Sequence, residues 1–210
     1  MPEQNPVTKP AGAKIRLLDA ATQLVREKGF SSTTVDDLCA AAGVTKGAFF
    51  HHFPSKDALG VAAANHWAET TTDLFAQAPY HLSADPLDRV FAYLDFRAEL
   101  IAGEIPEFTC LVGTMVQEVH ETSPAIRDAC EASITGHART LVPDIAAALA
   151  AHRVEGVDPY GLALHTQAVL QGAFILAKAA GPGGGTEIAR ASAAHLKRYL
   201  QLLFAKPREP

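Results

Sequence analysis

Apolar side chains recur every three or four residues along most of the chain, which is the period of one face of an α-helix. Ile15, Leu18, Ala21 and Val25 form one such face, and Gly29 directly after it is a common helix terminator. The sequence shows neither the alternation of a strand nor an internal repeat. The pattern therefore predicts an all-α fold of nine helices, at about residues 12–28, 34–42, 46–53, 55–78, 86–103, 108–123, 124–152, 159–180 and 186–204.

Prolines and glycines decide several of these boundaries. Pro79 breaks the long helix that begins at Ser55, and the glycine-rich run 181–185 separates the last two helices. The segment 108–123 forms either one helix or a broken pair. Pro143 lies inside the helix predicted for 124–152, and we expect it to kink that helix.

Residues 33–56 combine two short helices with a tight turn. Thr33 or Thr34 can cap the first helix, and an acid three residues later completes a capping box. Gly43 supplies the left-handed conformation that ends this helix, and Thr45 can cap the next. Two helices joined by a short glycine-containing turn form a helix-turn-helix, whose second helix enters the major groove of DNA. We expect four apolar side chains to close its core: Leu38, Val44, Phe49 and Phe53.

The same residues, in this order, resemble the DNA-binding segment of the TetR-type transcriptional repressors, and the likeness extends over residues 14–60. The shared features are the threonines at 33 and 34, Ala-Ala-Gly-Val at 41–44, Thr-Lys-Gly at 45–47, the aromatic pair Phe49 and Phe50, His52 with Phe53, and Pro-Ser-Lys at 54–56. One departure is Phe50, where the family often has a tyrosine whose hydroxyl contacts a phosphate.

The resemblance implies a three-helix DNA-binding domain at 11–56, followed by a larger six-helix domain at 57–210 for ligand sensing and dimerisation. Lys46 and its neighbours at the start of the second helix would approach bases or phosphates, and Lys56 would hold a phosphate. The expected partner is a double-stranded DNA operator. The expected DNA-contacting residues are Thr33, Thr34, Thr45, Lys46, Gly47, Ala48, Phe50, His51, His52 and Lys56.

The charge of the chain is compatible with this reading once it is divided by region. The net charge is -5, but residues 1–60 carry seven Lys or Arg against six acids. No apolar run approaches the roughly 18 residues of a membrane span, and the first residues lack the apolar centre of a signal peptide. We therefore expect a cytoplasmic protein without membrane contact, whose three cysteines are reduced.

The last two predicted helices, at about 159–204, carry more apolar surface than one partner helix would cover. The apolar residues are Leu162, Val169, Leu170, Ala173, Phe174 and Ala177 on the first helix, and Ile188, Ala189, Ala193, Leu196, Leu200 and Leu203 on the second. These stripes face either a second copy of the chain or the core of the same chain. The resemblance favours a homodimer with a four-helix interface, which would present two recognition helices to a palindromic operator.

Catalytic and metal-binding motifs are absent from the sequence. It has no nucleophile elbow, phosphate loop, HExxH or CxxC. The neighbours His51 and His52 point to different sides of a helix, so they are poorly placed to chelate one ion. We expect no catalytic residue, no metal site and no cofactor. An all-helical enzyme remains the less favoured alternative to a DNA-binding regulator.

The middle helices supply aromatic side chains with a few polar ones, a composition that suits a pocket for a small organic effector. The expected effector-binding residues are Trp67, Tyr93, Phe96, Arg97, Phe108, Cys110, Met115, Gln117, His165, Gln171 and Phe174. Plain core packing explains the aromatic residues equally well. A DNA-binding or adaptor protein without a ligand is the competing function.

Cys110 is the candidate for a reactive thiol. The segment around it resembles a TetR subgroup that includes sensors of reactive electrophiles and small organic acids. Cys110 lies close to a predicted helix start, where the helix dipole favours a thiolate, and Lys178 would stabilise that thiolate if its helix packs nearby. Cys39 and Cys130 are expected to be small core residues, and an inert buried Cys110 is the alternative.

Overall fold

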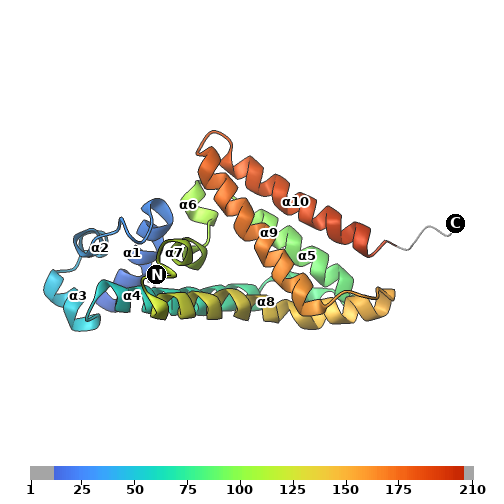
Figure 1. The fold of residues 1–210 in the computed structure, drawn as a ribbon, viewed down its shortest axis with the longest axis horizontal. Coiled ribbons are helices and arrows are strands. Elements are labelled where there is room, and N and C mark those ends of the chain that lie inside the picture. The colour runs from blue at the N-terminus through green and yellow to red at the C-terminus, as the bar shows by residue number, and fades with distance from the viewer. Residues whose placement is uncertain (1–11, 206–210) are drawn as a thin grey trace, which may run out of the picture.

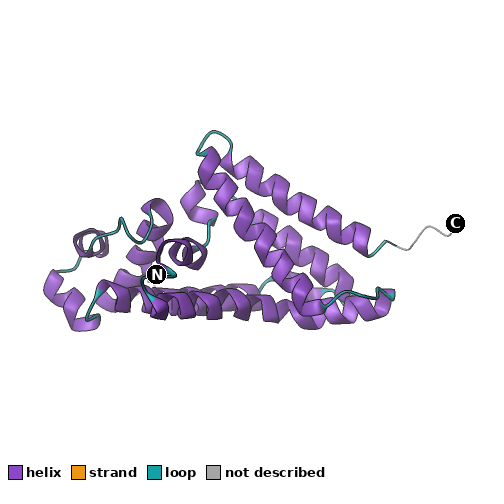
Figure 2. Ribbon diagram, in the orientation of Figure 1, coloured by secondary structure: helices purple, strands orange, loops and turns teal. Residues whose placement is uncertain are grey.

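The computed structural model describes residues 12–205. Within this range the chain forms ten α-helices and one short 3-10 helix, with no strand (Figure 2). The all-α prediction is confirmed. The helices are α1 Ala13–Lys28, α2 Val35–Ala42, α3 Lys46–His52, α4 Lys56–Ala76, α5 Pro86–Glu99, α6 Ile105–Phe108, α7 Leu111–Val119, α8 Pro124–His152, α9 Pro159–Ala180 and α10 Gly185–Leu203, with the 3-10 helix η1 at Pro79–Leu82.

The predicted helix boundaries differ from the structure mainly between residues 100 and 123. We expected no helix between those at 86–103 and 108–123. The short helix α6 lies there, with Pro106 in its first turn and a capping box formed by Glu104 and Glu107. Thr109 and Cys110 are extended, and Cys110 then caps α7. The segment 108–123 thus contains one helix, α7, preceded by the last residue of α6. Farther along, α8 continues through Pro143 to His152.

The helices divide the molecule into two ends. α1, α2 and α3 gather at one end, and α4 runs from them alongside the long α8 (Figure 1). α5, α9 and α10 form the other end, where α10 lies outermost against α9. α6 and α7 lie between the two ends, α6 near the upper end of α9 and α7 just above α8 in this view. α4 therefore joins the N-terminal helices to the larger C-terminal group.

One hydrophobic cluster holds the N-terminal helices together. Leu38, Phe49 and Phe53 are buried in it, as the sequence predicts, and Val44 packs against its edge. The cluster also takes in apolar residues of α7 and the first half of α8, which lie far away in the sequence. Glu118 of α7 strengthens this contact, because its carboxylate accepts hydrogen bonds from the backbone N–H groups of Phe30 (3.2 Å) and Ser31 (2.8 Å).

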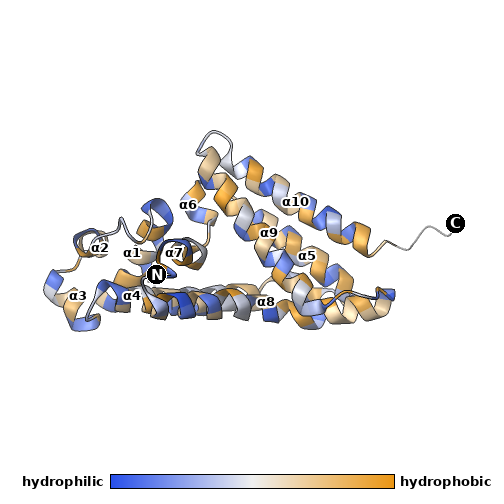
Figure 3. Cartoon of the chain, viewed as in Figure 1, coloured by the Kyte–Doolittle hydropathy of each residue, from blue (hydrophilic) through white to orange (hydrophobic). Residues whose placement is uncertain are grey.

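A second cluster fills the C-terminal end, and it corrects the choice of dimer residues. Apolar and polar positions alternate around α9 and α10 (Figure 3). Most of the apolar residues selected from the sequence, including Leu170 and Leu200, are buried between the helices of the same chain. Ile188 on α10 is the one selected residue that is exposed. The other uncovered large apolar side chains are Ile175 and Leu176 on α9, and Tyr199 and Leu202 on α10.

Candidate DNA-binding surface and ligand cavity

Local hydrogen bonds fix the shape of the α2–turn–α3 unit. Thr34 and Asp37 form the predicted capping box: the Asp37 N–H donates to Thr34 Oγ1 (3.1 Å), and the Thr34 N–H donates to Asp37 Oδ2 (2.9 Å). Gly43 ends α2 in the left-handed conformation, with φ 60° and ψ 43°. Thr45 then caps α3, since its Oγ1 accepts a hydrogen bond from the Ala48 N–H (3.1 Å). The turn is the one that a helix-turn-helix requires.

α3 presents an open face at the end of the molecule. Lys46, Gly47, Phe50 and His51 are exposed on it, while Ala48 and His52 are partly covered. The ammonium of Lys46 lies 2.8 Å from the carboxylate of Asp36 on α2, and this hydrogen bond raises the lysine pKa. DNA approaching this face therefore meets a cation that already has an acidic partner.

Two of the expected DNA contacts have structural roles in the protein. Thr33 is buried, and its hydroxyl donates to the carbonyl of Gly29 (2.7 Å). The Lys56 ammonium donates to the carbonyls of Phe30 and Thr33, each at 2.9 Å, and to that of Ser31 at 3.4 Å. An ammonium has three N–H donors, so these bonds use all of them. Thr33 is thus buried in the loop before α2, which corrects the expectation that it faces DNA. Lys56 is half-buried and fastens the same loop, and its contact with a phosphate stays a prediction.

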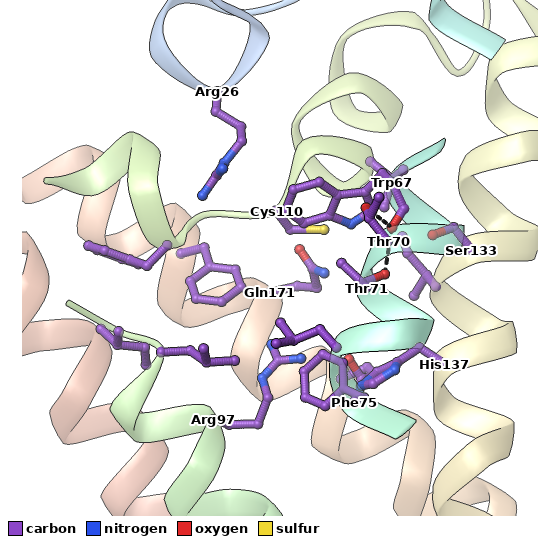
Figure 4. A pocket seen from close by; sticks show the side chains of 18 of the residues that line it. Arg26, Trp67, Thr70, Thr71, Phe75, Arg97, Cys110, Ser133, His137 and Gln171 are labelled. Atoms are coloured by element: carbon purple, nitrogen blue, oxygen red, sulfur yellow. Dashed lines mark hydrogen bonds between the residues drawn. The ribbon is translucent and has the colours of Figure 1, made fainter. Parts of the chain in front are cut away.

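A cavity of about 330 Å³ lies between the N-terminal and C-terminal groups of helices. Trp67, Thr71 and Phe75 of α4 line one wall (Figure 4), and the rings of Phe108 and Phe174 also belong to the lining. Two guanidinium groups, those of Arg26 and Arg97, reach into it from different sides. The remaining lining residues are Thr70, Leu74, Leu100, Ile101, Glu107, Phe108, Cys110, Val112, Ser133, Ile134, His137, Gln167 and Gln171. Volume and lining are those of a site for a small organic molecule.

The cavity brings together about half of the expected effector-binding residues. The six that line it are Trp67, Arg97, Phe108, Cys110, Gln171 and Phe174. Arg97 stacks its guanidinium over the rings of Phe75 (5.4 Å) and Phe174 (6.0 Å). Gln171 lies against Gly113, where any larger residue would meet its side chain.

The other five expected residues do not line this cavity. Met115 is fully buried in the cluster beneath the N-terminal helices. Gln117 is exposed and donates to the carbonyl of Gly113 (2.6 Å), while His165 lies on the surface beside Tyr199. Tyr93 and Phe96 pack against Phe75 and Tyr80 one layer behind the cavity wall. Helical spacing shows which residues share a face of a helix, but it does not show which face of the helix points into the cavity.

Polar residues that the sequence did not single out complete the wall. Gln167 Nε2 donates to the Tyr93 hydroxyl (3.1 Å), which lies 2.9 Å from His137 Nε2. Gln167, Tyr93 and His137 thus form one hydrogen-bonded chain along the wall. Burial, followed by the charge of Arg97, lowers the pKa of His137 to about 3.

Arg26 is the other residue that sequence analysis missed, because it belongs to α1 and not to the middle helices. Its guanidinium lies 5.2 Å from the centre of the Trp67 ring, and burial lowers its pKa. No motif marks Arg26. Its only sequence signal is a charged residue next to Val25 on the buried side of α1.

The three cysteines occupy different environments. Cys130 is buried, and burial raises the pKa of its thiol to about 12. Burial also raises the pKa of Cys39, so both behave as the small core residues that the sequence predicts. Cys110 is half-buried and lines the cavity, with its sulfur accepting a hydrogen bond from the Gly113 N–H (3.4 Å). The Lys178 ammonium donates to Thr114 Oγ1 (2.7 Å) one turn farther along α7.

Within residues 12–205, no cluster of three or more His, Cys, Asp or Glu side chains has the arrangement of a metal site. None of the helices in this range combines the length and the apolar composition needed to span a membrane.

Comparison with known proteins agrees with both parts of this architecture. The family described as "Bacterial regulatory proteins, tetR family" matches residues 17–63, which contain the helix-turn-helix. The family described as "Tetracyclin repressor-like, C-terminal domain" matches residues 86–193, which is more than half of the chain. The chain belongs to the TetR family of transcriptional regulators.

The individual relatives have low sequence identity to this chain. The HTH-type transcriptional repressor DhaR of Mycobacterium sp. (strain GP1) is 30% identical over 111 residues, which are 53% of this chain and 54% of that protein. The transcriptional regulator AcuR of Cereibacter sphaeroides is 34% identical over 103 residues, 49% of this chain and 47% of that protein. The chain thus spans about half the length of these curated relatives. A crystal structure of regulatory protein TetR from Rhodobacter sphaeroides has a TM-score of 0.74 and 28% identity, covering 87% of this chain and 98% of that one.

Proposed function

We propose that the chain is a ligand-responsive repressor. It binds a palindromic operator in the cytoplasm as a homodimer, and a small organic effector in the cavity releases the DNA. The observation that carries this proposal is the path of α4. This helix starts directly after the helix-turn-helix, packs against α1, and lines the cavity with Trp67, Thr70, Thr71, Leu74 and Phe75. An effector that displaces α4 also displaces α3.

Operator geometry makes such a displacement effective. The two recognition helices of a dimer read half-sites about 34 Å apart per turn of DNA, so a shift of a few ångströms misaligns one helix while the other is docked. Because the coupling is reciprocal, the effector and the operator each weaken binding of the other.

A footprint of the protein on the DNA upstream of its own gene tests the proposal. We expect two protected half-sites with two-fold symmetry, and loss of protection when an effector from a small-molecule screen is added. Effector affinity measured with and without saturating operator should differ by the same factor. Equal affinities under both conditions would rule the coupling out.

The uncovered side of α9 and α10 supports a homodimer through these helices. On α10, Ile188, Tyr199 and Leu202 are exposed at helical spacing, and on α9 Ile175 and Leu176 are exposed. Gly172 lies one turn before Ile175, and a Cβ there would have no neighbour within 4 Å. This side of α9 is therefore open in a single chain and smooth enough for another helix to approach closely.

Gly172→Glu tests this interface. In one chain the new side chain points into open space, and replacing glycine inside a helix favours the helix. We expect an unchanged helix content but a monomer in sedimentation, with operator affinity reduced at least tenfold. Gly136→Glu is the matched control, because Gly136 lies within α8 and is equally open. A Gly172→Glu protein that remains dimeric would place the interface elsewhere.

The position of Cys110 supports a second mechanism of release, in which an electrophile modifies its thiol and the protein leaves the DNA. Its thiol lines the cavity at the N-terminus of α7, and the charge of Lys178 lies close enough to interact with it. Cys110→Ser should keep operator affinity and abolish release by a thiol-alkylating agent. Release that persists in this variant, or a folded wild-type protein whose Cys110 resists alkylation, would remove this candidate.

A further inference from the structure

The Arg26 guanidinium carries a buried donor that the protein does not use. Within residues 12–205, Arg26 Nε is one of two buried side-chain nitrogen or oxygen atoms without a hydrogen-bond partner, the other being Thr109 Oγ1. A buried N–H that makes no hydrogen bond destabilises the structure, and more so on a charged group. Stacking on Trp67 compensates part of the charge, but it offers no acceptor in the plane of the guanidinium.

The charge of Glu107, the acid that lines the cavity, favours the charged form of Arg26 but leaves its Nε donor without an acceptor. The Oε2 atom of Glu107 accepts a hydrogen bond from the Glu104 N–H (2.6 Å), and no ion pair joins Glu107 to Arg26 in the described structure. Arg97 likewise forms no ion pair or hydrogen bond within the described residues, and its guanidinium lies over the rings of Phe75 and Phe174. His137 is neutral. Two guanidinium groups therefore face one carboxylate, and the cavity carries excess positive charge.

We propose that the effector is a small organic carboxylate whose acid group binds Arg26 and whose apolar body lies among the rings of Trp67, Phe75, Phe108 and Phe174. This inference rests on the proposed effector site. A guanidinium offers parallel N–H donors that match a carboxylate, and such charge-assisted bonds are the strong ones. A phosphate group would bring more negative charge and more acceptor oxygens than the few donors near Arg26 can satisfy.

An effector bound in this way touches the DNA-binding helices directly. Arg26 lies on α1, and the same helix is tied to α2 by the Arg16 side chain, whose Nε donates to the carbonyl of Ala42 (2.9 Å). The ion pair between Lys28 and Asp37 (2.7 Å) joins the two helices again. A carboxylate that draws Arg26 into the cavity therefore acts on the helix-turn-helix through α1 as well as through α4.

Trp67 is the single tryptophan of the chain, and it gives the test a direct signal. Acids and their uncharged amides are titrated while its fluorescence is followed: benzoate against benzamide, phenylacetate against phenylacetamide, and octanoate against octanamide. We expect at least one acid to saturate the signal and to bind at least tenfold more tightly than its amide. No response to any of the acids, or equal binding of acid and amide, would overturn the proposal.

Two variants locate the acid group. Arg26→Met keeps the length and apolar stem of the side chain but removes its donors, and it should abolish the preference for the acid over the amide. Arg97→Met removes the other guanidinium of the cavity and should leave that preference in place. A preference lost in Arg97→Met but kept in Arg26→Met would overturn the assignment.

A conservative variant protects the test against a folding defect. Arg26→Lys keeps the charge without the planar guanidinium, and it should lower the preference for the acid several-fold. An unchanged preference in this variant would contradict a role of the guanidinium donors. These titrations contain no DNA, so their outcome is independent of the operator footprint that tests the repressor function.

Discussion

The two ends of the molecule satisfy their polar groups in different ways. At the helix-turn-helix end, Thr34, Thr45 and Ser55 cap the helix that directly follows each of them. Around the cavity, polar side chains come from α1, α4, α5, α8 and α9, and the buried Arg26 Nε has no hydrogen-bond partner within residues 12–205. The DNA-binding end is therefore shaped by its own sequence neighbours. The cavity is shaped by helices far apart in the chain, and a bound ligand would supply the acceptor that Arg26 Nε lacks.

Replacing a phenylalanine at each end should give the largest difference. Phe49 is fully buried among packed neighbours, and Phe49→Ala should lower the free energy of unfolding by about 3–5 kcal/mol. Phe108 lines the cavity and already lacks neighbours on one side, so Phe108→Ala should cost less than half as much. Urea unfolding of both variants measures the two values. Equal losses would mean that the cavity wall is as tightly packed as the core.

His137 should make the stability of the cavity end depend on pH. Its pKa is about 3 in the folded protein, below the usual value of about 6.5, so between these values only the unfolded chain takes up the proton. The stability contributed by the neutral His137 is fully present above about pH 6.5. It is lost, on the order of a few kcal/mol, as the pH drops to about 3. His137→Gln should flatten this region of the pH profile. A wild-type profile already flat between pH 6.5 and 4 would contradict the burial of a neutral imidazole.

The stability of the helix-turn-helix end should depend on pH in a different range, because Asp37 titrates there. The hydrogen bonds of Asp37 to Lys28 and to Thr34 hold the pKa of this carboxyl well below its usual range. A carboxyl whose pKa is lowered by folding contributes stability above the pKa that it has in the unfolded chain. This contribution is lost only as the pH falls through the lower pKa of the folded protein. The pH range from 6.5 to 4.5 thus separates the two ends, because His137 already loses stability there and Asp37 does not.

Local chemistry explains why one end could be predicted and the other only in part. The capping box and the left-handed Gly43 depend on residues within about four positions of one another, and Phe49 is an apolar residue at helical spacing, so the pattern of residue types predicts all three. The role of Lys56 could not be read in this way. Its ammonium meets carbonyls more than 20 residues away, and a lysine at a helix start resembles a phosphate ligand equally well.

Which residues line the cavity depends on how each helix is rotated about its own axis, and the sequence does not specify this rotation. Trp67 and Phe174 could be predicted as parts of an apolar wall, but Met115 and Tyr93 have the same composition signal and lie in packed layers. Arg26 was out of reach, because it enters the cavity from a helix that belongs by motif to the DNA-binding part. Packing between distant helices decides such placements, and periodicity alone does not specify it.

The smallest expected effect concerns the charge pair on the open face of the helix-turn-helix. Lys46 and Asp36 are both exposed, and such a pair contributes little to stability. Asp36→Asn should release the ammonium for a phosphate, tighten operator binding a few-fold, and steepen the salt dependence by about one phosphate contact. Asp57→Asn is the matched control, since Asp57 is an exposed first-turn acid of α4 with the same charge change and no ion pair to Lys46. If both variants tighten binding equally, the effect comes from net charge alone, and Lys46 does not contact the DNA backbone.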